Sequence, residues 1–492
     1  MLSSFYKNTK NQQPAKREQL YLLPLMDDKP FMDMAVKLAQ LKAGRKDLSF
    51  IRLFYFKTSV DFLYVTNWVS RQFAGYRADG PTKQNWLLQQ YGFKRDQLVF
   101  SNILFYFKNY RRKKLKSKFD LINLNINGVK VGDLIYDHYL RFKSKPTVDI
   151  DDPALYDLID YTTTLCNKLE GFLKKNTFEC IIVPYGAYVQ WGTIVRVGVK
   201  MNVPVYTYGN SNYILQKATL NHPFHRADQY LFHDLFKKIQ NDKRLPLYLE
   251  RAKNVLEERL IGIIDSSLAY MRTSAYGKEQ TAVFDPPADK PFAIIFSHCF
   301  FDSPHIYGDM LFPDFYEWIG FILSEAKKVP GVNFYLKLHP NGLEGNAEII
   351  EELISMHPSP NIFILPASTN NRAILEKKPS AIFSVYGTVC HEFAYCGIPV
   401  VTAGDNPHSQ YKFLYQPASI EEFSWFVKNV GNYGLPEEYH KEDIVEFFFM
   451  NYMFFSEKYH NAEMVTLKDF TTGEISFDMN LKDDELVYNA NV

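Results

Sequence analysis

The segment Phe334–Asn341 (FYLKLHPN) carries the most informative pair of reactive side chains in the sequence. A strand here would place Lys337 and His339 on the same side, because side chains alternate along a strand. Pro340 would end that strand at the carboxyl edge, where open α/β sheets bind ligands. Lysine can neutralise a leaving phosphate and histidine can donate a proton to it, so the segment predicts a phosphate site with His339 as a catalytic group. The alternative is a surface turn after a buried strand.

A second segment, Phe383–Val401 (FSVYGTVCHEFAYCGIPVV), combines hydroxyl side chains with a glycine turn ahead of a predicted helix. Ser384 and Thr388 would stand beside the free N–H groups at the helix start, and Gly387 would permit the tight turn. Glu392 could accept hydrogen bonds from both hydroxyls of a ribose. The alternatives are a plain helix cap at Thr388 and a solvated acid at Glu392.

A third segment, Phe296–His305 (FSHCFFDSPH), follows the first predicted strand of the second half. His298, Asp302 and Ser303 are expected in a loop that reaches toward the space between two domains. This loop lacks GxGxxG, and the chain has no GxxxxGK[ST], so neither a dinucleotide-binding fold nor a P-loop is supported.

In the first half, the segment Leu121–Phe142 is predicted to be a strand, a turn and a helix. On that helix Asp133, Asp137 and Arg141 form one polar stripe. A carboxylate can act as the base of an inverting sugar transfer or as the nucleophile of a retaining one, and Arg141 could clamp a sugar carboxylate. The alternative is a helix cap at Asp133 with an Asp137–Arg141 surface pair.

Two tyrosines, Tyr185 and Tyr208, follow predicted strands and are candidates for stacking on a sugar, although tyrosines at strand ends also close cores. The run Asp149-Ile150-Asp151 matches the metal-binding pattern DxD. It precedes Asp152-Pro153 and a helical pattern, so helix capping accounts for these acids and no metal site is predicted.

The elements that position these residues alternate between short β-rich runs and helical patterns, which is typical of parallel α/β folds. The predicted strands are Leu20–Leu25, Ser49–Phe56, Leu121–Ile126, Glu179–Pro184 and Val203–Tyr208 in the first half, and Phe292–Ser297, Val332–Leu338, Asn361–Leu365, Ala381–Val385 and Ile398–Thr402 in the second.

These strands divide the chain into two Rossmann-like domains that face each other across a cleft. We predict a polar tail over residues 1–18, an acceptor-side domain over 19–276, and a linker over 277–291. A donor-binding domain over 292–435 and a helical return segment over 436–492 complete the prediction.

The composition agrees with a large globular protein. The chain has 492 residues and a formal net charge of +1, so it lacks the basic field that nucleic acid binding needs. Its 5 cysteines contain no CxxC pair, which favours a reducing cytoplasm and disfavours zinc.

The KLHP, SVYGT and GIPVV motifs, with Glu392 four residues after Thr388, together resemble the donor half of GT-B glycosyltransferases that use CMP-activated sugars. They are similar to the bacterial capsule and lipopolysaccharide transferases of Kdo (3-deoxy-manno-octulosonate) and related nonulosonates. The resemblance covers about Phe292–Val401. It implies that the His-Pro motif and the Ser/Thr turn hold the CMP phosphate from two sides. It also implies a metal-independent transferase with a CMP-sugar donor, no further cofactor, and a polysaccharide or lipid-linked glycan acceptor.

The same motifs occur in part in polyol-phosphate transferases of teichoic acid synthesis, which use cytidine nucleotides. A CDP-polyol-dependent enzyme and a non-catalytic capsule-assembly protein therefore remain as alternatives. The basic run Lys108–Lys118 (KNYRRKKLKSK) follows an aromatic stretch, which suits peripheral contact with the anionic inner face of the bacterial membrane. The alternative is a solvated basic loop.

Overall fold

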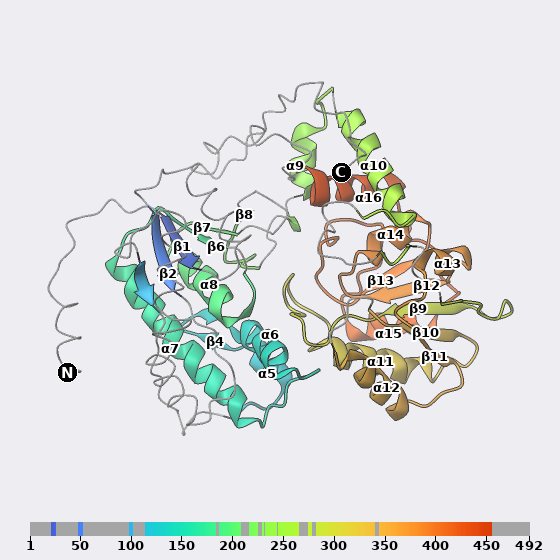
Figure 1. Cartoon of the computed structure of the whole chain (residues 1–492), viewed down its shortest axis with the longest axis horizontal. Helices are drawn as coiled ribbons and strands as arrows, with labels where there is room; N and C mark the ends of the chain where they lie inside the picture. Colours follow the sequence, from blue (N-terminus) through green and yellow to red (C-terminus); the bar gives the residue numbers. More distant parts are fainter. Residues whose placement is uncertain are drawn as a thin grey trace, which may run out of the picture.

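The computed structural model describes residues 21–25, 48–52, 98–101, 114–183, 186–207, 216–224, 229–230, 232–243, 245–264, 274–277, 282–339 and 344–454. Two sheets lie in two lobes, one formed mainly by the first half of the chain and one by the second (Figure 1). The predicted α/β fold with two Rossmann-like, GT-B-like domains is confirmed by these sheets.

The first sheet has the strand order β3-β2-β1-β6-β7-β8. Its strands up to β7 pair in parallel, and β8 runs antiparallel to β7. The strands are β1 Tyr21–Leu25, β2 Leu48–Arg52, β3 Leu98–Ser101, β6 Cys180–Val183, β7 Val205–Thr207 and β8 Gln216–Lys217. All four residues of β6 are buried, because helices and further chain cover both faces of a parallel sheet.

The second sheet has the order β11-β10-β9-β12-β13, and all of its pairs are parallel. Its strands are β9 Phe292–Phe296, β10 Asn333–Lys337, β11 Ile362–Leu365, β12 Ala381–Ser384 and β13 Val400–Thr402. Chain order therefore reverses between β9 and β12, and such a switch point is where open α/β sheets bind ligands.

The helices of the first half are α5 Lys118–Ile122, α6 Gly132–Lys143, α7 Pro153–Lys175, the π-helical turn η3 Tyr188–Gly192, α8 Thr193–Lys200, α9 Phe232–Ile239 and α10 Leu245–Leu260. Those of the second half are α11 Phe315–Ala326, α12 Asn346–Met356, α13 Asn371–Glu376, α14 Val389–Tyr395, α15 Ile420–Lys428, α16 Lys441–Phe448 and the π-helical turn η6 Phe449–Met453.

The strand predicted over Leu121–Ile126 is wrong. Its first residues belong to helix α5, and a small hairpin follows, with β4 at Asn125–Ile126 and β5 at Val129–Lys130. The physical reason is a capping box: the Ser117 side chain accepts from the Asp120 N–H, and the Asp120 carboxylate accepts from the Ser117 N–H. This cap starts a helix before the apolar residues can extend a strand. Strand β3 was not predicted.

Three apolar clusters form the core. One lies between the first sheet and α6, α7 and α8, and another between the second sheet and α11, α12 and α15. The third contains residues of both sheets together with α9, α10 and α16. In Figure 1 α9, α10 and α16 lie together above the second sheet, and the final helices α16 and η6 pack on α10.

The two lobes also touch through polar side chains. The Asp314 carboxylate, at the N-cap of α11, accepts hydrogen bonds from Tyr136 and from Thr147, the latter at 2.5 Å. The Lys130 ammonium lies 2.8 Å from the Asp309 carboxylate. These contacts fix α6 against the loop that follows β9, so residues of both lobes can share one site.

The domain boundaries themselves stay a prediction, and residues 1–18 and part of the linker lie outside the described residues. Within the described part of the chain, no helix is both long and apolar enough to cross a membrane.

Candidate functional site

The loops after β9 and β12 meet at the switch point of the second sheet, and His298 joins them. Its ring is almost fully buried and stacks on Phe315 with centroids 4.7 Å apart. Nε2 of His298 accepts the Val385 N–H at 3.1 Å and lies 3.2 Å from the Ser384 Oγ. Burial lowers the pKa of His298 to about 3, so the ring is neutral near pH 7. His298 therefore holds the Ser384 turn in place as a hydrogen-bond acceptor.

The turn from Ser384 to Thr388 leaves little room for a side chain at Gly387. A Cβ there would lie 3.2 Å from the Ser384 Oγ and 3.3 Å from a methyl group of Val389. Thr388 is the N-cap residue of α14, but its side chain makes no capping hydrogen bond. The helix cap that was the alternative for Thr388 is therefore not formed through its hydroxyl.

Lys337 and His339 lie together at the end of β10. Lys337 is 1% exposed, and its ammonium donates to the carbonyl oxygen of Ala367 at 3.4 Å. Burial lowers the pKa of Lys337 to about 8. His339 is exposed, yet desolvation by its neighbours, followed by the charge of Lys337, lowers its pKa. The predicted grouping of a cation and a histidine at the end of β10 is present.

Two further predicted donor residues, Asp302 and Ser303, link the loop after β9 to its surroundings. The Asp302 carboxylate accepts from the Ser303 N–H at 3.0 Å and from the Tyr188 hydroxyl at 3.4 Å. The Ser303 carbonyl accepts from the Tyr386 hydroxyl at 3.3 Å. Tyr386 belongs to the turn after β12, and Tyr188 belongs to the first lobe. The loop after β9 therefore contacts both the predicted phosphate-binding turn and the first lobe.

Glu392 is buried and accepts a hydrogen bond from the Tyr276 hydroxyl at 2.8 Å. Burial, followed by the charge of Glu392, raises the pKa of Tyr276 well above its ordinary value. Glu392 is therefore not the solvated acid that was one alternative for this residue. Its predicted contact with a ribose stays a prediction.

Asp133 forms a buried ion pair within the first lobe. Its two carboxylate oxygens accept from the two terminal nitrogens of Arg196 at 2.5 and 2.6 Å. Burial would raise the pKa of Asp133, but the guanidinium holds it below its ordinary value. Asp133 lies inside α6 with Val131 as the N-cap, so the capping alternative is wrong.

Asp137 pairs with His305 across the two lobes. Oδ1 of Asp137 lies 2.6 Å from Nδ1 of His305, and Oδ2 accepts the His305 backbone N–H at 3.3 Å. Burial raises the pKa of Asp137 to about 6. Burial alone would lower the pKa of His305, but the Asp137 carboxylate offsets this and the pKa is raised. Nε2 of His305 is buried and has no hydrogen-bond partner among the described residues.

The remaining predicted site residues are either exposed or outside the described residues. Arg141 is exposed, whereas Asp137 is buried and paired with His305, so the alternative Asp137–Arg141 surface pair is wrong. Tyr185, Tyr208 and Pro340 lie outside the described residues.

The acids of the DxD run have local partners. Asp149 accepts from the Asp151 N–H, Asp151 pairs with Lys114 at 2.6 Å, and Asp152 caps α7 with Pro153 as the first helical residue. Capping at Asp152 is confirmed. Among the described residues, no cluster of histidine, cysteine and acidic side chains has a geometry that could hold a metal ion.

Sequence reasoning missed His305 and Arg196. His305 ends the loop segment from which His298, Asp302 and Ser303 were chosen, so a third ionisable residue in that loop was a usable signal. Arg196 is a single cation in the otherwise apolar stretch TIVRVGV, a pattern that indicates a buried charge with a buried partner.

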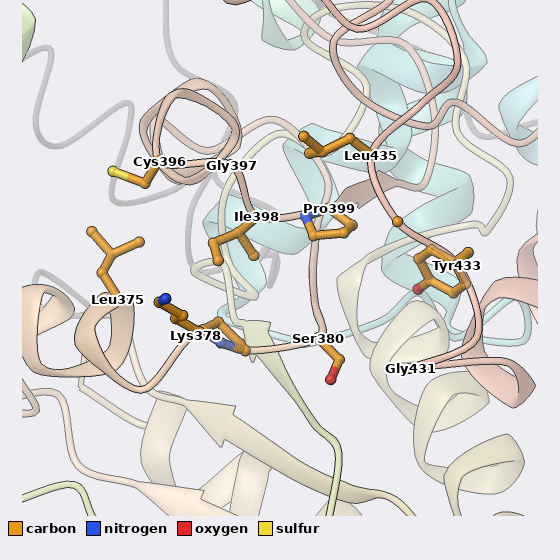
Figure 2. Close-up of a pocket in the computed structure, with 12 residues that line it drawn as sticks. Leu375, Lys378, Ser380, Cys396, Gly397, Ile398, Pro399, Gly431, Tyr433 and Leu435 are labelled. Carbon is orange, nitrogen blue, oxygen red and sulfur yellow. The ribbon is translucent and has the colours of Figure 1, made fainter.

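A pocket of about 580 Å³ lies at the opposite edge of the second sheet, where β12 and β13 begin (Figure 2). Ser380 and Pro399, which precede these strands, line it together with Lys378 and Tyr433. This pocket is at the amino ends of the strands, so it is separate from the edge that carries the predicted donor residues.

No protein-family model and no curated protein matches the sequence. Among solved structures, the chain is similar to a β-Kdo 2,4-transferase, KpsC, from Thermosulfurimonas dismutans, with 13% identity, 56% of this chain and 79% of that chain covered, and a TM-score of 0.34. It is also similar to a UDP-GlcNAc 2-epimerase from Neisseria meningitidis, with 12% identity, 87% and 97% covered, and a TM-score of 0.24. At these values the fold assignment rests on the two sheets, and the similarities carry no argument about activity.

Proposed function

We propose that this chain is a glycosyltransferase that moves a Kdo-like sugar from a CMP-activated donor to a bacterial surface polysaccharide or lipid-linked glycan. The observation that carries the proposal is the buried Asp137–His305 pair, which joins the two lobes beside the ligand-binding edge of the second sheet. An acid–histidine pair between two Rossmann-like domains suits transfer between a nucleotide-bound sugar and an acceptor hydroxyl.

The donor phosphate is assigned to the end of β10 and the turn after β12. Lys337 brings a positive charge. Because the side chain is buried, this charge is disfavoured unless an anion binds beside it. The hydroxyl of Ser384 is positioned by His298, and the missing Cβ of Gly387 leaves the Ser384 and Val389 side chains their place in the tight turn. His339 donates a hydrogen bond or proton to the leaving phosphate, and the resemblance in the sequence motifs supports CMP as the nucleotide.

His305 is assigned as the proton acceptor. Both oxygens of Asp137 are engaged by His305 and both oxygens of Asp133 by Arg196, so Nε2 of His305 is the open reactive atom. The acceptor hydroxyl gives its proton to Nε2 while its oxygen bonds to the sugar carbon. The bond from that carbon to the phosphate oxygen breaks, and CMP leaves with the electron pair. Asp137 positions the ring and stabilises its charged form.

A thermal-shift panel of CMP, CDP, UDP and ADP, followed by measurement of CMP release from CMP-Kdo, tests the proposal. We expect CMP to give the largest shift. We expect His339→Ala to lower CMP release by ~10²–10⁴-fold and His357→Ala, at the C-terminal end of α12, to leave it unchanged. A response to CDP-polyols in place of CMP would identify the polyol-phosphate enzyme. The absence of binding by any cytidine nucleotide would instead favour a non-catalytic assembly protein.

Membrane contact by the basic run Lys108–Lys118 is part of the proposal and is supported by its sequence. Only Lys114–Lys118 is described, and there Lys114 is exposed and paired with Asp151. Binding to vesicles with anionic lipid should weaken as salt increases and should be lost when Arg111, Arg112, Lys113 and Lys114 are neutralised. Binding that survives neutralisation would contradict this contact.

A further inference from the structure

Helix α6 presents two neighbouring side chains, Tyr136 and Asp137, to the second lobe, which it faces in Figure 1. Asp137 pairs with His305, and the Tyr136 hydroxyl donates to the Asp314 carboxylate. All four residues are buried. His305 and Asp314 stand at the two ends of the segment 305–314, which leads from the loop after β9 to α11. Adjacent residues of α6 therefore hold this segment of the second lobe at both of its ends.

The ring of Tyr136 also contacts the His305 imidazole directly. The ring centroids are 5.3 Å apart and the ring planes meet at 74°, which is the edge-to-face arrangement that aromatic pairs prefer. Asp137 binds Nδ1 of the imidazole and the backbone N–H of His305. The hydrogen bond at Nδ1 fixes one atom of the imidazole, and the tyrosine ring limits the remaining tilt of its plane. Together they hold Nε2 in one direction.

The position of Tyr136 is in turn fixed by Asp314. Oδ2 of Asp314 accepts from the Tyr136 hydroxyl and from Thr147, and Oδ1 accepts from the Glu317 N–H at 2.9 Å, where Asp314 is the N-cap of α11. Burial, followed by the charge of Asp314, raises the pKa of Tyr136 well above its ordinary value, so the hydroxyl remains a proton donor. The tyrosine is thus tied to the start of a helix of the second lobe.

Helix α6 contains a second buried tyrosine with the same kind of partner. The Tyr139 hydroxyl donates at 2.8 Å to Asp152, which is the N-cap of α7 just as Asp314 is the N-cap of α11. This second bond lies within the first lobe, whereas Tyr136 reaches across to the second lobe and contacts His305. The contact with His305 is therefore what separates Tyr136 from a tyrosine that only anchors a helix.

We propose that Tyr136 is a positioning residue for His305, holding the imidazole so that Nε2 points toward the acceptor hydroxyl. This inference rests on the proposed function, in which Nε2 of His305 takes the proton of that hydroxyl. Tyr136 acts through His305 alone and takes no part in the proton transfer. A change at Tyr136 should therefore slow the chemical step without weakening the binding of CMP, whose phosphate is assigned to the end of β10 and the turn after β12.

The test compares Tyr136→Phe and Tyr136→Leu with the wild type in the rate of CMP release, measured over a range of CMP-Kdo concentrations. Phenylalanine keeps the ring beside His305 and loses the bond to Asp314, while leucine loses both. Tyr139→Phe and Tyr139→Leu are the matched controls. They remove the same kind of bond and the same ring from the same helix, at a position whose bond lies within the first lobe.

In Tyr136→Leu we expect kcat to fall about 2- to 13-fold, the factor to which the free energy of one edge-to-face aromatic contact corresponds. KM for CMP-Kdo and the thermal shift caused by CMP should not change. Tyr136→Phe should lose less activity, because it retains the ring contact. The Tyr139 variants should be less stable but keep the kcat of the wild type. A wild-type kcat in Tyr136→Leu, or an equal fall in Tyr139→Leu, would overturn the inference.

A second measurement does not depend on the proposed function. Histidine labelled with ¹³C at Cε1 gives one NMR signal for each ring, and the signal that disappears in His305→Ala belongs to His305. This signal should shift or broaden in Tyr136→Leu and stay as in the wild type in Tyr139→Leu. An unchanged signal in Tyr136→Leu would overturn the positioning role.

Failure of the proposed function gives a different pattern. If the wild type releases no CMP from CMP-Kdo, the proposed function fails, and the NMR signal of His305 then decides the role of Tyr136. A signal that responds to Tyr136→Leu but not to Tyr139→Leu would support Tyr136 as the residue that positions His305 in a protein of another activity. A signal that responds to neither variant would overturn both proposals.

Discussion

Replacing Lys337 by methionine should stabilise the folded chain while removing its response to CMP. Lys337 is 1% exposed, and burial lowers the pKa of its ammonium from 10.5 to about 8. At ~1.4 kcal/mol for each tenfold change in proton affinity, burying this charge costs ~3 kcal/mol near pH 7. Methionine has a similar shape and no charge, so most of that cost should be recovered as free energy of unfolding.

The dependence on pH gives the sharper measurement. Because the pKa of Lys337 is lower in the folded chain, the unfolded chain binds more protons between about pH 8 and 10.5. The free energy of unfolding should therefore rise with pH across that window in the wild type, and this rise should be absent in Lys337→Met. Near pH 7, below the window, the variant should melt ~5–10 °C higher in the transition of the second domain.

Thermal unfolding at pH 7 and pH 9.5, with and without CMP, measures both effects. Lys290→Met is the control, because Lys290 is an exposed lysine just before β9 and its replacement should change neither stability nor CMP binding by much. A Lys337→Met protein that is less stable than the wild type at pH 7, or that keeps its response to CMP, would refute the reasoning. The first result would mean that the ammonium is favourably paired, and the second that the phosphate binds elsewhere.

Three more predictions follow from the site. His305→Ala should lower CMP release from CMP-Kdo in the presence of acceptor by ~10²–10⁴-fold without changing the CMP-induced thermal shift; an unchanged rate would remove His305 from the chemistry. Asp133→Asn should leave the Arg196 guanidinium buried without its counter-charge and lower the free energy of unfolding, measured in urea, by ~3–5 kcal/mol. A loss below about 1 kcal/mol would show that water reaches the guanidinium and replaces the carboxylate. Gly387→Ala should weaken CMP binding in calorimetry, because the new methyl group meets the Ser384 Oγ at 3.2 Å, and unaltered affinity would place the ligand away from this turn.

The edge of the second sheet could be predicted from sequence because its signals are local. The period-two pattern of the segment that contains β10 predicts Lys337 and His339 on one side, and the apolar strand that ends at Ser384 leads directly into a glycine turn. The parallel strands of the two sheets follow in the same way from alternating strand and helix patterns. In contrast, Leu121–Ile126 was misread because a local capping box at Ser117 outweighed an apolar run that was equally compatible with a strand.

The partners of the two aspartates could not be predicted, because spacing along one helix does not say what faces it. Asp133 and Asp137 lie one helical turn apart, yet one pairs with Arg196 of α8 and the other with His305 of the second lobe, 168 residues away. Burial of both carboxylates depends on the docking of whole elements, and that docking decides which charges must be paired. The sequence by itself determined the residue types and the α/β pattern that places several of them at the carboxyl edge of the second sheet. Only the tertiary structure decided that Asp137 meets His305, because these side chains come together only after the two lobes pack against each other.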